Sequence, residues 1–198
     1  MVVNAVVVAA GKGERMGTLL PKPFLSVAGA PLVVHTLRNL TRSALIEKII
    51  LVVAAEREAL CRELLEESGP FAIPLVITHG GEERQDSVRL GLTALESDCD
   101  IVIIHDAARP FITAEVVDRS VAVAVEYGGA LVAIPARDTI KKVNKEQMVV
   151  ATMPRQELWL AQTPQTFRVE VIREAHLRAH LLGVIVTDDA ALLEWAGG

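Results

Sequence analysis

A glycine-rich segment near the N-terminus has the residue types of a phosphate-binding loop. It follows an apolar run, reads Ala-Ala-Gly-Lys-Gly-Glu-Arg-Met-Gly over residues 9–17, and leads to Lys22, which lies between Pro21 and Pro23. Glycine lets backbone amides approach a polyanion, and the basic side chains supply positive charge. The two prolines restrict the backbone around Lys22, which suits a cation that is held in place to stabilise charge on a phosphate. Because residue 16 is methionine, the segment does not match the Gly-x-Gly-x-x-Gly dinucleotide fingerprint, and it lacks the Gly-Lys-Ser/Thr ending of a P-loop.

A second glycine-rich segment covers residues 80–88 and reads Gly-Gly-Glu-Glu-Arg-Gln-Asp-Ser-Val. A glycine pair before a helix start offers free amides and a small cavity. Arg84 and Ser87 are three residues apart, so they share one side of the predicted helix. The pattern predicts either a pocket for a base or ribose or an ordinary turn followed by a capped helix.

A third segment ends an apolar run with His105, Asp106 and Arg109. An acid that directly follows a buried strand lies at the ligand-binding edge of an open sheet, where a carboxylate can hold Mg²⁺ against phosphate oxygens. Asp106 is therefore the predicted metal ligand. The alternative is that Asp106 caps a turn or pairs with Arg109. His105 is more typical of a hydrogen-bonded structural residue than of a catalytic one.

Four later segments contain hydroxyl, amide and charged side chains that could bind a phosphorylated co-substrate. They span residues 136–139, 152–155, 162–165 and 187–189. Each is equally typical of a helix cap or of a polar surface.

The elements that position these segments form an alternating pattern of apolar runs and amphipathic stretches. We predict strands at Val3–Ala9, Lys48–Ala54, Leu75–His79, Ile101–His105, Ala130–Pro135 and Val184–Thr187, and helices at Leu32–Thr41, Glu56–Ser68, Glu83–Ala94, Ala114–Tyr127 and Val169–Leu182. Such alternation favours an α/β fold with a doubly wound, mostly parallel sheet that helices cover on both faces. Ligands bind such sheets outside the carboxyl ends of the strands, where the segments described above fall.

Residues 137–159 interrupt this alternation with two charged, strand-like stretches and a turn at Asn144–Glu146. The pattern predicts a projecting hairpin. It is either a solvated surface hairpin or an arm that packs on a second subunit. We find no interdomain linker, so residues 1–198 are interpreted as one domain.

Composition excludes several classes of protein. Hydrophobic residues make up 51% of the 198 residues, which excludes disorder. The net charge of −5 argues against a nucleic acid or an anionic membrane as partner. The chain has no apolar run of membrane-spanning length and no targeting segment, and its two cysteines, Cys61 and Cys99, favour a reducing cytoplasm.

Several blocks of the sequence, in the same order, resemble the 2-C-methyl-D-erythritol 4-phosphate cytidylyltransferases of the non-mevalonate isoprenoid pathway. The blocks are Ala9–Met16, Pro21-Lys22, Gly80–Val88, His105–Pro110, Arg137–Thr139, Arg155, Leu158-Trp159, Thr163–Gln165 and Thr187-Asp188. The block His-Asp-Ala-Ala-Arg-Pro is the most specific of them. The resemblance covers nearly the whole chain and implies a Rossmann-like nucleotidyltransferase fold, a homodimer completed by the arm, and Mg²⁺ or another divalent cation as cofactor.

The resemblance also implies the reaction and the residues that carry it. CMP would pass from CTP to the 4-phosphate of methylerythritol with release of pyrophosphate. The implied catalytic residues are Arg15 and Lys22, and the implied metal ligand is Asp106. The residues implied to surround the nucleotide are Ala9, Ala10, Gly11, Gly13, Gly80, Arg84 and Ser87, and those implied for the methylerythritol phosphate are Asp106, Arg109, Thr139, Arg155, Thr163 and Thr187.

The sequence departs from the family at its end. The family usually continues into another strand and a segment with an acidic residue and Asn-Ile-Lys-Val-Thr, whereas this sequence stops at Gly198. That segment would contribute a second Mg²⁺ carboxylate and a lysine for the substrate phosphate. Two other functions remain open, a ribitol-5-phosphate cytidylyltransferase and a CTP-binding module without turnover.

Overall fold

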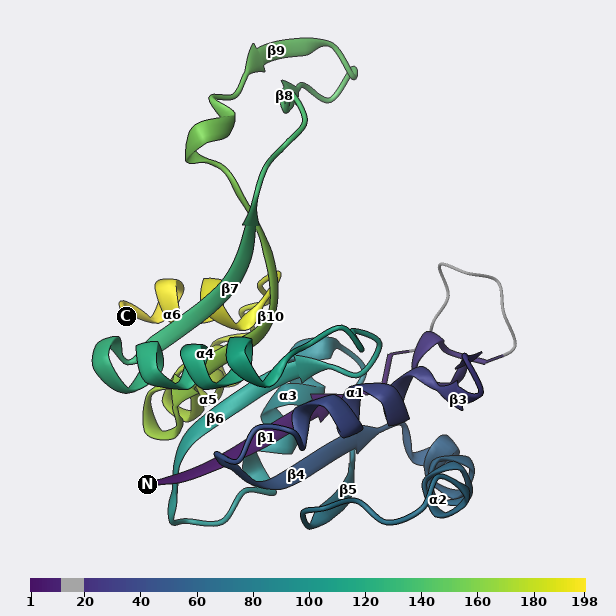
Figure 1. The fold of residues 1–198 in the computed structure, drawn as a ribbon. Coiled ribbons are helices and arrows are strands. Elements are labelled where there is room, and N and C mark those ends of the chain that lie inside the picture. Colours follow the sequence, from purple (N-terminus) through teal and green to yellow (C-terminus); the bar gives the residue numbers. More distant parts are fainter. Residues whose placement is uncertain (12–19) are drawn as a thin grey trace.

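The fold is built around a six-stranded sheet in the order β5-β4-β1-β6-β10-β7. The computed structural model describes residues 1–11 and 20–198 (Figure 1). The strands of this sheet are β1 (Val2–Val8), β4 (Ile46–Val53), β5 (Leu75–His79), β6 (Cys99–Asp106), β7 (Gly129–Pro135) and β10 (Trp159–Arg168). Neighbouring strands from β5 to β6 pair in parallel, and β10 is antiparallel to both β6 and β7. The predicted α/β fold with a mostly parallel sheet is confirmed.

The continuous Val/Ile-rich strands arise because both faces of the sheet are buried. Successive side chains of a strand point to opposite faces. In β1, Ala5 and Val7 pack into one hydrophobic core and Val6 packs into another. Both positions of this alternation are therefore apolar, which is the pattern of a central parallel strand rather than of a strand with one wet face.

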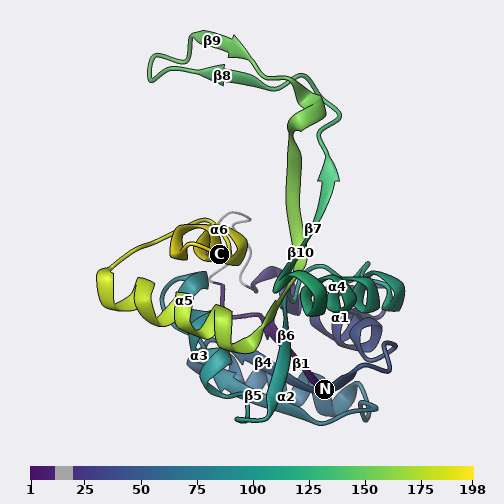
Figure 2. The same cartoon turned by 90° about the vertical axis from the view of Figure 1, so that its left-hand side faces the viewer.

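Helices cover both faces of the sheet. The first core contains side chains of α1 (Leu32–Leu40), α2 (Glu58–Glu67) and α4 (Ala114–Tyr127), and the second contains those of α3 (Arg84–Thr93) and α5 (Val169–Leu182). Helix α6 (Asp189–Ala196) packs on α5 (Figures 1 and 2). None of the helices in the described ranges 1–11 and 20–198 is long and apolar enough to cross a bilayer.

Short elements complete the chain. Two short pairs of strands stand outside the main sheet, β2 (Ser26–Val27) with β3 (Ala30–Pro31) and β8 (Lys141–Val143) with β9 (Val149–Thr152). The described residues also form single turns of 3-10 helix at η2 (Lys22–Phe24), η3 (Ala55–Arg57) and η4 (Arg155–Glu157).

The arm predicted over residues 137–159 projects away from the sheet, as both views show (Figures 1 and 2). It continues the ladder between β7 and β10, in which Trp159 pairs with Pro135, and it ends in the β8–β9 pair. Every residue of β8 and β9 is exposed. The arm therefore makes its contacts along its own length rather than with the helices of its chain.

The strand predicted at Val184–Thr187 is wrong. This segment is irregular, and Val184 and Val186 pack between α5 and α6 instead. Both polar atoms of the Gln85 side-chain amide hold the segment, because Nε2 donates to the carbonyl oxygen of Val184 and Oε1 accepts from the amide of Val186. The strand that completes the sheet is β10, between β6 and β7. The pattern did not predict β10 because its centre reads Gln-Thr-Pro-Gln rather than a run of β-branched residues.

Candidate active site

A cleft of about 800 Å³ opens at the carboxyl ends of β1 and β6 and beside the loop that follows β5. Within the described part of the chain, it is lined by Val8, Ala9, Ala10, Gly11, Lys22, Pro23, Gly81, Glu82, Glu83, Arg84, Ser87, Asp106, Ala108 and Arg109. The three segments that the sequence analysis placed at the sheet edge thus meet in one cavity. Its size suits a nucleotide-sized ligand.

The glycine pair after β5 lets two loops touch. The Gly80 amide donates to the carbonyl oxygen of Val53 at 2.8 Å, and a Cβ at Gly80 would lie 2.5 Å from the Cβ of Ala10 and 2.6 Å from the Oγ of Ser87. The buried Ser87 hydroxyl accepts from the Gly81 amide at 3.2 Å and donates to the Glu83 carbonyl at 3.1 Å. Ala10 and Ser87 line the cleft and Gly80 packs tightly behind them, so the three form one wall although Gly80 is not among the described residues that line the cleft. Ser87 holds the loop backbone through its two hydrogen bonds.

Replacing Gly80 by alanine is expected to destabilise this wall. The added methyl group would overlap Ala10 and Ser87, and overpacking of this kind costs about 1–3 kcal/mol. Urea unfolding of the Gly80→Ala variant measures the loss. Gly11→Ala is the matched control, because a Cβ at Gly11 meets nothing within 4 Å among the described residues. Equal stabilities of the two variants would contradict the close contact.

Helix α3 carries Arg84 and Ser87 to the cleft because it packs unusually close to the sheet. A Cβ at Gly91 would lie 2.5 Å from a methyl carbon of Val6 and 2.8 Å from one of Val52. Only glycine permits this approach without a shift. The short distance between α3 and the sheet sets the position of the first turn of the helix, which carries Arg84, relative to the strand ends.

Asp106 lies between two arginines at the end of β6. Its Oδ1 accepts from the Nε of Arg84 at 3.3 Å, and its Oδ2 accepts from the Nε of Arg109 at 2.8 Å. The backbone amide of Asp106 donates to the Oγ1 of Thr163 at 3.2 Å. Arg109 also donates to the side-chain oxygen of Gln162. The pairing of Asp106 with Arg109, which the sequence offered as the alternative to metal binding, is thus present, and the carboxylate still faces the cleft.

Arg84 has a second, buried partner. Its NH1 donates to the Oδ2 of Asp189 at 2.7 Å, and the Oδ1 of Asp189 lies 3.1 Å from the Nε2 of His176. Burial of Asp189 opposes its charge, but the hydrogen bond from His176 and the charge of Arg84 outweigh burial and hold the pKa of Asp189 below its usual value. Arg84 is therefore fixed between a buried carboxylate and the one in the cleft.

His105 is a buried structural residue behind Asp106. Its Nε2 donates to the backbone carbonyl of Arg109 at 3.1 Å, and its Nδ1 lies 3.0 Å from the Oγ1 of Thr163, whose hydroxyl donates to it. Both contacts suit the neutral imidazole. Burial lowers the pKa of His105 to about 4. These contacts agree with the structural interpretation of His105.

The lowered pKa of His105 predicts a pH dependence of stability. Between about pH 6.5 and 4, His105 is protonated in the unfolded chain but remains neutral in the folded chain. The free energy of unfolding therefore falls as the pH falls through this window. At pH 5 the loss from this group is about 2 kcal/mol relative to pH 7.5. Urea unfolding of the wild type at both pH values should show this loss of stability. The His105→Gln variant should lack the part of the loss that comes from His105. An exposed histidine variant, His180→Gln, should match the wild type, and an unchanged pH dependence in His105→Gln would refute the assignment.

Lys22 lies at the opening of the cleft and is held by its neighbours. The 3-10 turn that carries it is flanked by Pro21 and contains Pro23, and the Phe24 amide donates to the Pro21 carbonyl at 3.0 Å. Phe24 is buried in the first hydrophobic core. The exposed Lys22 side chain therefore stands on an anchored backbone, as the two prolines predicted. Gly13 and Arg15 lie outside the described residues.

Of the residues expected at the methylerythritol phosphate, Asp106 and Arg109 line this cleft, and the other four are not among its described lining residues. Thr139 is exposed in the arm between β7 and β8, and Arg155 in η4 donates to the backbone carbonyl of Arg137. Thr187 is exposed just before Asp188, the N-cap of α6. Thr163 lies behind the cleft, bonded to His105 and to the amide of Asp106.

The sequence analysis included Gln162 and Asp189 only within polar segments that could bind a co-substrate, and it did not predict that they hold the arginines of the cleft. Asp189 binds Arg84 across 105 residues of sequence, and Gln162 binds Arg109 across 53. Asp189 begins α6, where an acid is ordinarily explained by the helix dipole. Nothing in the local pattern distinguishes a carboxylate with this second partner.

The fold and the cleft place this chain among the Rossmann-like α/β proteins that bind phosphorylated ligands at the carboxyl edge of the sheet. The family model of IspD, 2-C-methyl-D-erythritol 4-phosphate cytidylyltransferase, matches residues 3–198. The chain belongs to this family of nucleotidyltransferases.

Individual relatives agree with the family. The protein of this name from Alkaliphilus metalliredigens is 44% identical over 196 residues, which cover 98% of this chain and 81% of the relative. Among solved structures, the 4-diphosphocytidyl-2C-methyl-D-erythritol synthase of Anaerococcus prevotii has a TM-score of 0.87 at 27% identity and covers 99% of this chain and 82% of that one. The Thermus thermophilus 2-C-methyl-D-erythritol 4-phosphate cytidylyltransferase has a TM-score of 0.78 at 31% identity, with 100% and 85% covered.

Proposed function

We propose that this protein transfers CMP from CTP to the phosphate of 2-C-methyl-D-erythritol 4-phosphate and releases pyrophosphate. The observation that carries the proposal is the match of residues 3–198 to the family, with relatives of this activity at 44% identity. The cleft agrees with the chemistry, because Lys22, Arg84, Arg109 and Asp106 all line it and the two arginines contact the carboxylate of Asp106.

The reaction requires charge neutralisation and alignment rather than a base. A phosphate oxygen of the acceptor forms a bond to the α-phosphorus of CTP, while the bond from that phosphorus to the bridging oxygen of the β-phosphate breaks and pyrophosphate leaves. The acceptor phosphate is already ionised at neutral pH, so no proton must be removed from it. Lys22 and Arg15 are the residues we propose to stabilise the negative charge that builds on the α-phosphate.

The nucleotide would lie against the small residues of the cleft. We assign cytosine and ribose to Ala9, Ala10, Gly11, Gly80, Arg84 and Ser87 on this side of the cleft, together with Gly13, which lies outside the described residues. Gly80 and Ala10 approach each other closely, so the space beside them for the base is narrow. A narrow space favours a pyrimidine over a larger purine. Arg84, held by Asp106 and Asp189, is the fixed cation on this side.

Asp106 fits the role of a Mg²⁺ ligand. Each of its oxygens takes one arginine N–H and retains a further acceptor site. The described residues contain no cluster of three or more acidic, histidine or cysteine side chains, and Mg²⁺ in such enzymes commonly takes one or two carboxylates and completes its shell with water and substrate phosphates. The ion, when bound, neutralises charge on the phosphates of CTP. Asp106 would hold it, with Arg84 and Arg109 orienting the carboxylate.

The acceptor phosphate would contact residues of two subunits. Arg109 lines the cleft, with Thr163 behind it, whereas Thr139 and Arg155 belong to the arm of the same chain. We propose a homodimer in which each arm reaches toward the cleft of its partner, so that Thr139, Arg155 and Thr187 help to position the methylerythritol phosphate. The arm carries exposed apolar side chains, including Val143, Met148, Val149 and Val150, that a second subunit would cover.

The proposed dimer predicts the effect of a charge on the arm. Val149 is 60% exposed in β9, and Val149→Lys is expected to weaken self-association about tenfold to hundredfold because a buried unpaired charge opposes an apolar contact. Sedimentation equilibrium measures the shift from twice the chain mass toward 21.4 kDa. The control is Val76→Lys, an exposed valine of β5 outside the arm, which should leave the dimer intact. A wild-type chain that sediments as a monomer at all concentrations would contradict the proposal.

We place the protein in the cytoplasm. Cys61 and Cys99 are both buried as free thiols, and burial raises the pKa of Cys61 to about 11. Because both thiols are buried, neither is accessible for disulfide formation.

The substrate pair is tested by pyrophosphate release. The purified chain is mixed with Mg²⁺, methylerythritol 4-phosphate and each of CTP, UTP, ATP and GTP, with ribitol 5-phosphate as the control acceptor. Release confined to CTP and methylerythritol phosphate is expected. Release with ribitol phosphate instead would assign the other cytidylyltransferase, and CTP binding without release would indicate a binding module.

A further inference from the structure

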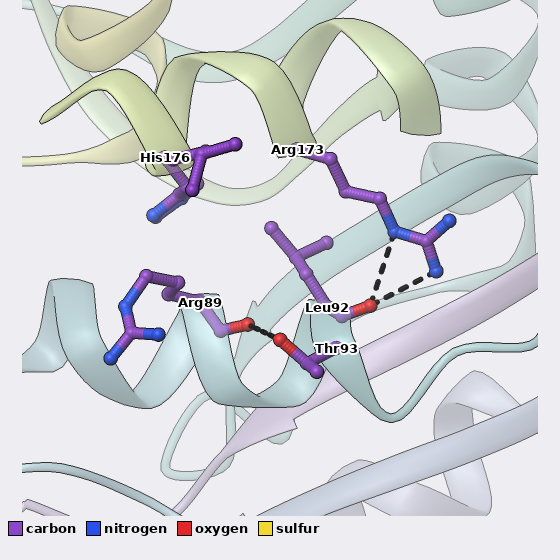
Figure 3. Close-up of a pocket in the computed structure, with 6 residues that line it drawn as sticks. Arg89, Leu92, Thr93, Arg173 and His176 are labelled. Atoms are coloured by element: carbon purple, nitrogen blue, oxygen red, sulfur yellow. Dashed lines mark hydrogen bonds between the residues drawn. The ribbon is translucent and has the colours of Figure 1, made fainter. Parts of the chain in front are cut away.

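A second cavity, of about 350 Å³, lies between α3 and α5 and shares no lining residue with the cleft. Arg89, Leu92 and Thr93 line it from α3, and Arg173, His176 and Leu177 line it from α5 (Figure 3). These residues recur three and four positions apart, so each triplet forms one face of its helix. The cavity is thus a facing pair of helix surfaces that do not close on each other.

One residue that lines the cavity, His176, has a buried polar atom without a partner among the described residues. His176 is 1% exposed, and its Nε2 lies 3.1 Å from the Oδ1 of Asp189, but its Nδ1 makes no hydrogen bond with any described residue. Buried polar atoms are almost always paired, because an unpaired one has lost its water without compensation. The free Nδ1 on a residue that lines a cavity therefore indicates a missing hydrogen-bonding partner.

The two charged side chains that line the cavity among the described residues, Arg89 and Arg173, are positive. Arg89 faces His176 across the gap (Figure 3), and the Nε of Arg89 is likewise buried and unpaired. The nearest carboxylate to Arg89 is that of Asp86, at 3.8 Å. Arg173 uses its guanidinium on the carbonyls of Leu92, Leu95 and Glu96 and pairs with no carboxylate among the described residues. The cavity therefore favours an anion.

We propose that this cavity binds a small phosphomonoester, with the phosphate between Arg89 and His176 and the organic part against Leu92 and Leu177. A phosphate accepts hydrogen bonds from the guanidinium of Arg89. At neutral pH it also exchanges a proton readily, so it pairs with Nδ1 either by donating an O–H or by accepting an N–H. The volume exceeds that of inorganic phosphate alone, and the two leucines supply an apolar surface for a short carbon chain.

The proposed site is linked to the catalytic cleft by a chain of hydrogen bonds. His176 contacts Asp189, Asp189 accepts from Arg84 at 2.7 Å, and Arg84 reaches Asp106 at 3.3 Å. A phosphate at Nδ1 would contact the same imidazole that holds Asp189. Occupation of the cavity should therefore alter how firmly Arg84 is held and, with it, the affinity for CTP.

Binding is tested with inorganic phosphate and glycerol 3-phosphate, followed by the ¹⁵N shifts of the His176 imidazole. The five histidines are separated by assigning His176 through His176→Gln. The wild-type Nδ1 signal is expected to move with each probe, at lower concentration with glycerol 3-phosphate. Arg89→Gln should abolish the shift. Leu177→Trp, which fills the cavity from a half-exposed position, should abolish it as well and guards against a folding defect in Arg89→Gln.

Two controls separate this site from the cleft. Lys22→Ala should retain the shift because it alters only the cleft, and Arg119→Gln should retain it because Arg119 is an exposed arginine of α4 on the other face of the sheet. No shift of His176 with either probe would overturn the proposal. So would a shift that is lost in Lys22→Ala and kept in Arg89→Gln, since it would place the phosphate in the cleft.

The link to the cleft is tested by CTP binding in the presence of glycerol 3-phosphate. Direct competition in the cleft affects the wild type and Arg89→Gln alike, so the difference between them reports the second cavity. A change in the Kd for CTP at least twofold larger in the wild type than in Arg89→Gln is expected. Equal changes would contradict the link. Because these readouts require no turnover, they remain informative if the proposed reaction fails.

Discussion

Replacing Lys22 by alanine is expected to lower kcat by about 10²–10³ while the KM for CTP changes much less. Loss of one positioned charge that stabilises a transition state costs about 3–4 kcal/mol. The structure supports a full effect at this position, because Pro21, Pro23 and the buried Phe24 fix the backbone from which Lys22 extends into the cleft. A cation on a mobile loop would have to be ordered during the reaction, and its removal would cost less.

Steady-state kinetics with CTP and methylerythritol 4-phosphate measure this effect. Lys48→Ala is the matched control, because Lys48 pairs with Glu96 near the opposite end of the sheet. It removes the same charge from the protein without touching the cleft. A Lys22→Ala variant with full turnover would exclude Lys22 from the proposed mechanism, whatever happens to the control.

Replacing Asp106 by asparagine is expected to lower kcat/KM by at least about 10² and to raise the Mg²⁺ concentration that gives half-maximal activity. Asparagine has nearly the same shape but only one acceptor oxygen and no charge. Arg84 and Arg109 would then lose the carboxylate that each contacts, and a divalent ion would lose its protein ligand. The two effects act together on the charge of the cleft.

Magnesium titrations of the wild type and of Asp106→Asn separate the role in metal binding from that in arginine positioning. If Asp106 holds the ion, saturating Mg²⁺ restores part of the activity of the variant. Asp98→Asn, in an exposed loop before β6, supplies the control for loss of a carboxylate. An Asp106→Asn variant with the same Mg²⁺ dependence as the wild type would show that Asp106 is not the ligand.

The parts of the fold that follow local rules were predictable from sequence. The strand at Leu75–His79 and the helices at Ala114–Tyr127 and Val169–Leu182 have the bounds that periodicity predicted. Helix α4 begins at the N-cap Thr113, whose hydroxyl accepts from the Val116 amide, and ends at Gly128 in the left-handed conformation. These signals lie within the segment that they organise, so a single sequence reveals them.

Strand β10 was not predictable in this way because its place depends on distant partners. Thr166 pairs with Ile103 of β6 on one side and with Ala130 of β7 on the other, so a polar, proline-containing segment is held as a strand from both edges. Val184–Thr187 shows the converse. Its composition is typical of a strand, but it lies outside the sheet because its backbone is bonded to the side chain of Gln85 and its valines pack between α5 and α6. Tertiary contacts override propensity in both cases.

The candidate site divides along the same line. The cleft residues Lys22, Arg84 and Asp106 were predictable because each follows a predicted strand, and strand ends meet at one edge. Their supports, Gln162 and Asp189, were not, because the contacts join segments far apart in sequence. The roles of the cleft residues and of Thr139, Arg155 and Thr187 stay predictions that the variants test.

The central claim is that an acceptor phosphate attacks the α-phosphorus of CTP in this cleft. ³¹P NMR of a reaction with CTP, Mg²⁺ and methylerythritol 4-phosphate tests it most directly. The account predicts that the acceptor phosphate signal is replaced by two coupled diphosphate signals in step with the appearance of pyrophosphate. Formation of CDP together with a newly phosphorylated acceptor would place the attack at the γ-phosphorus and contradict the account, as would hydrolysis of CTP with the acceptor phosphate unchanged.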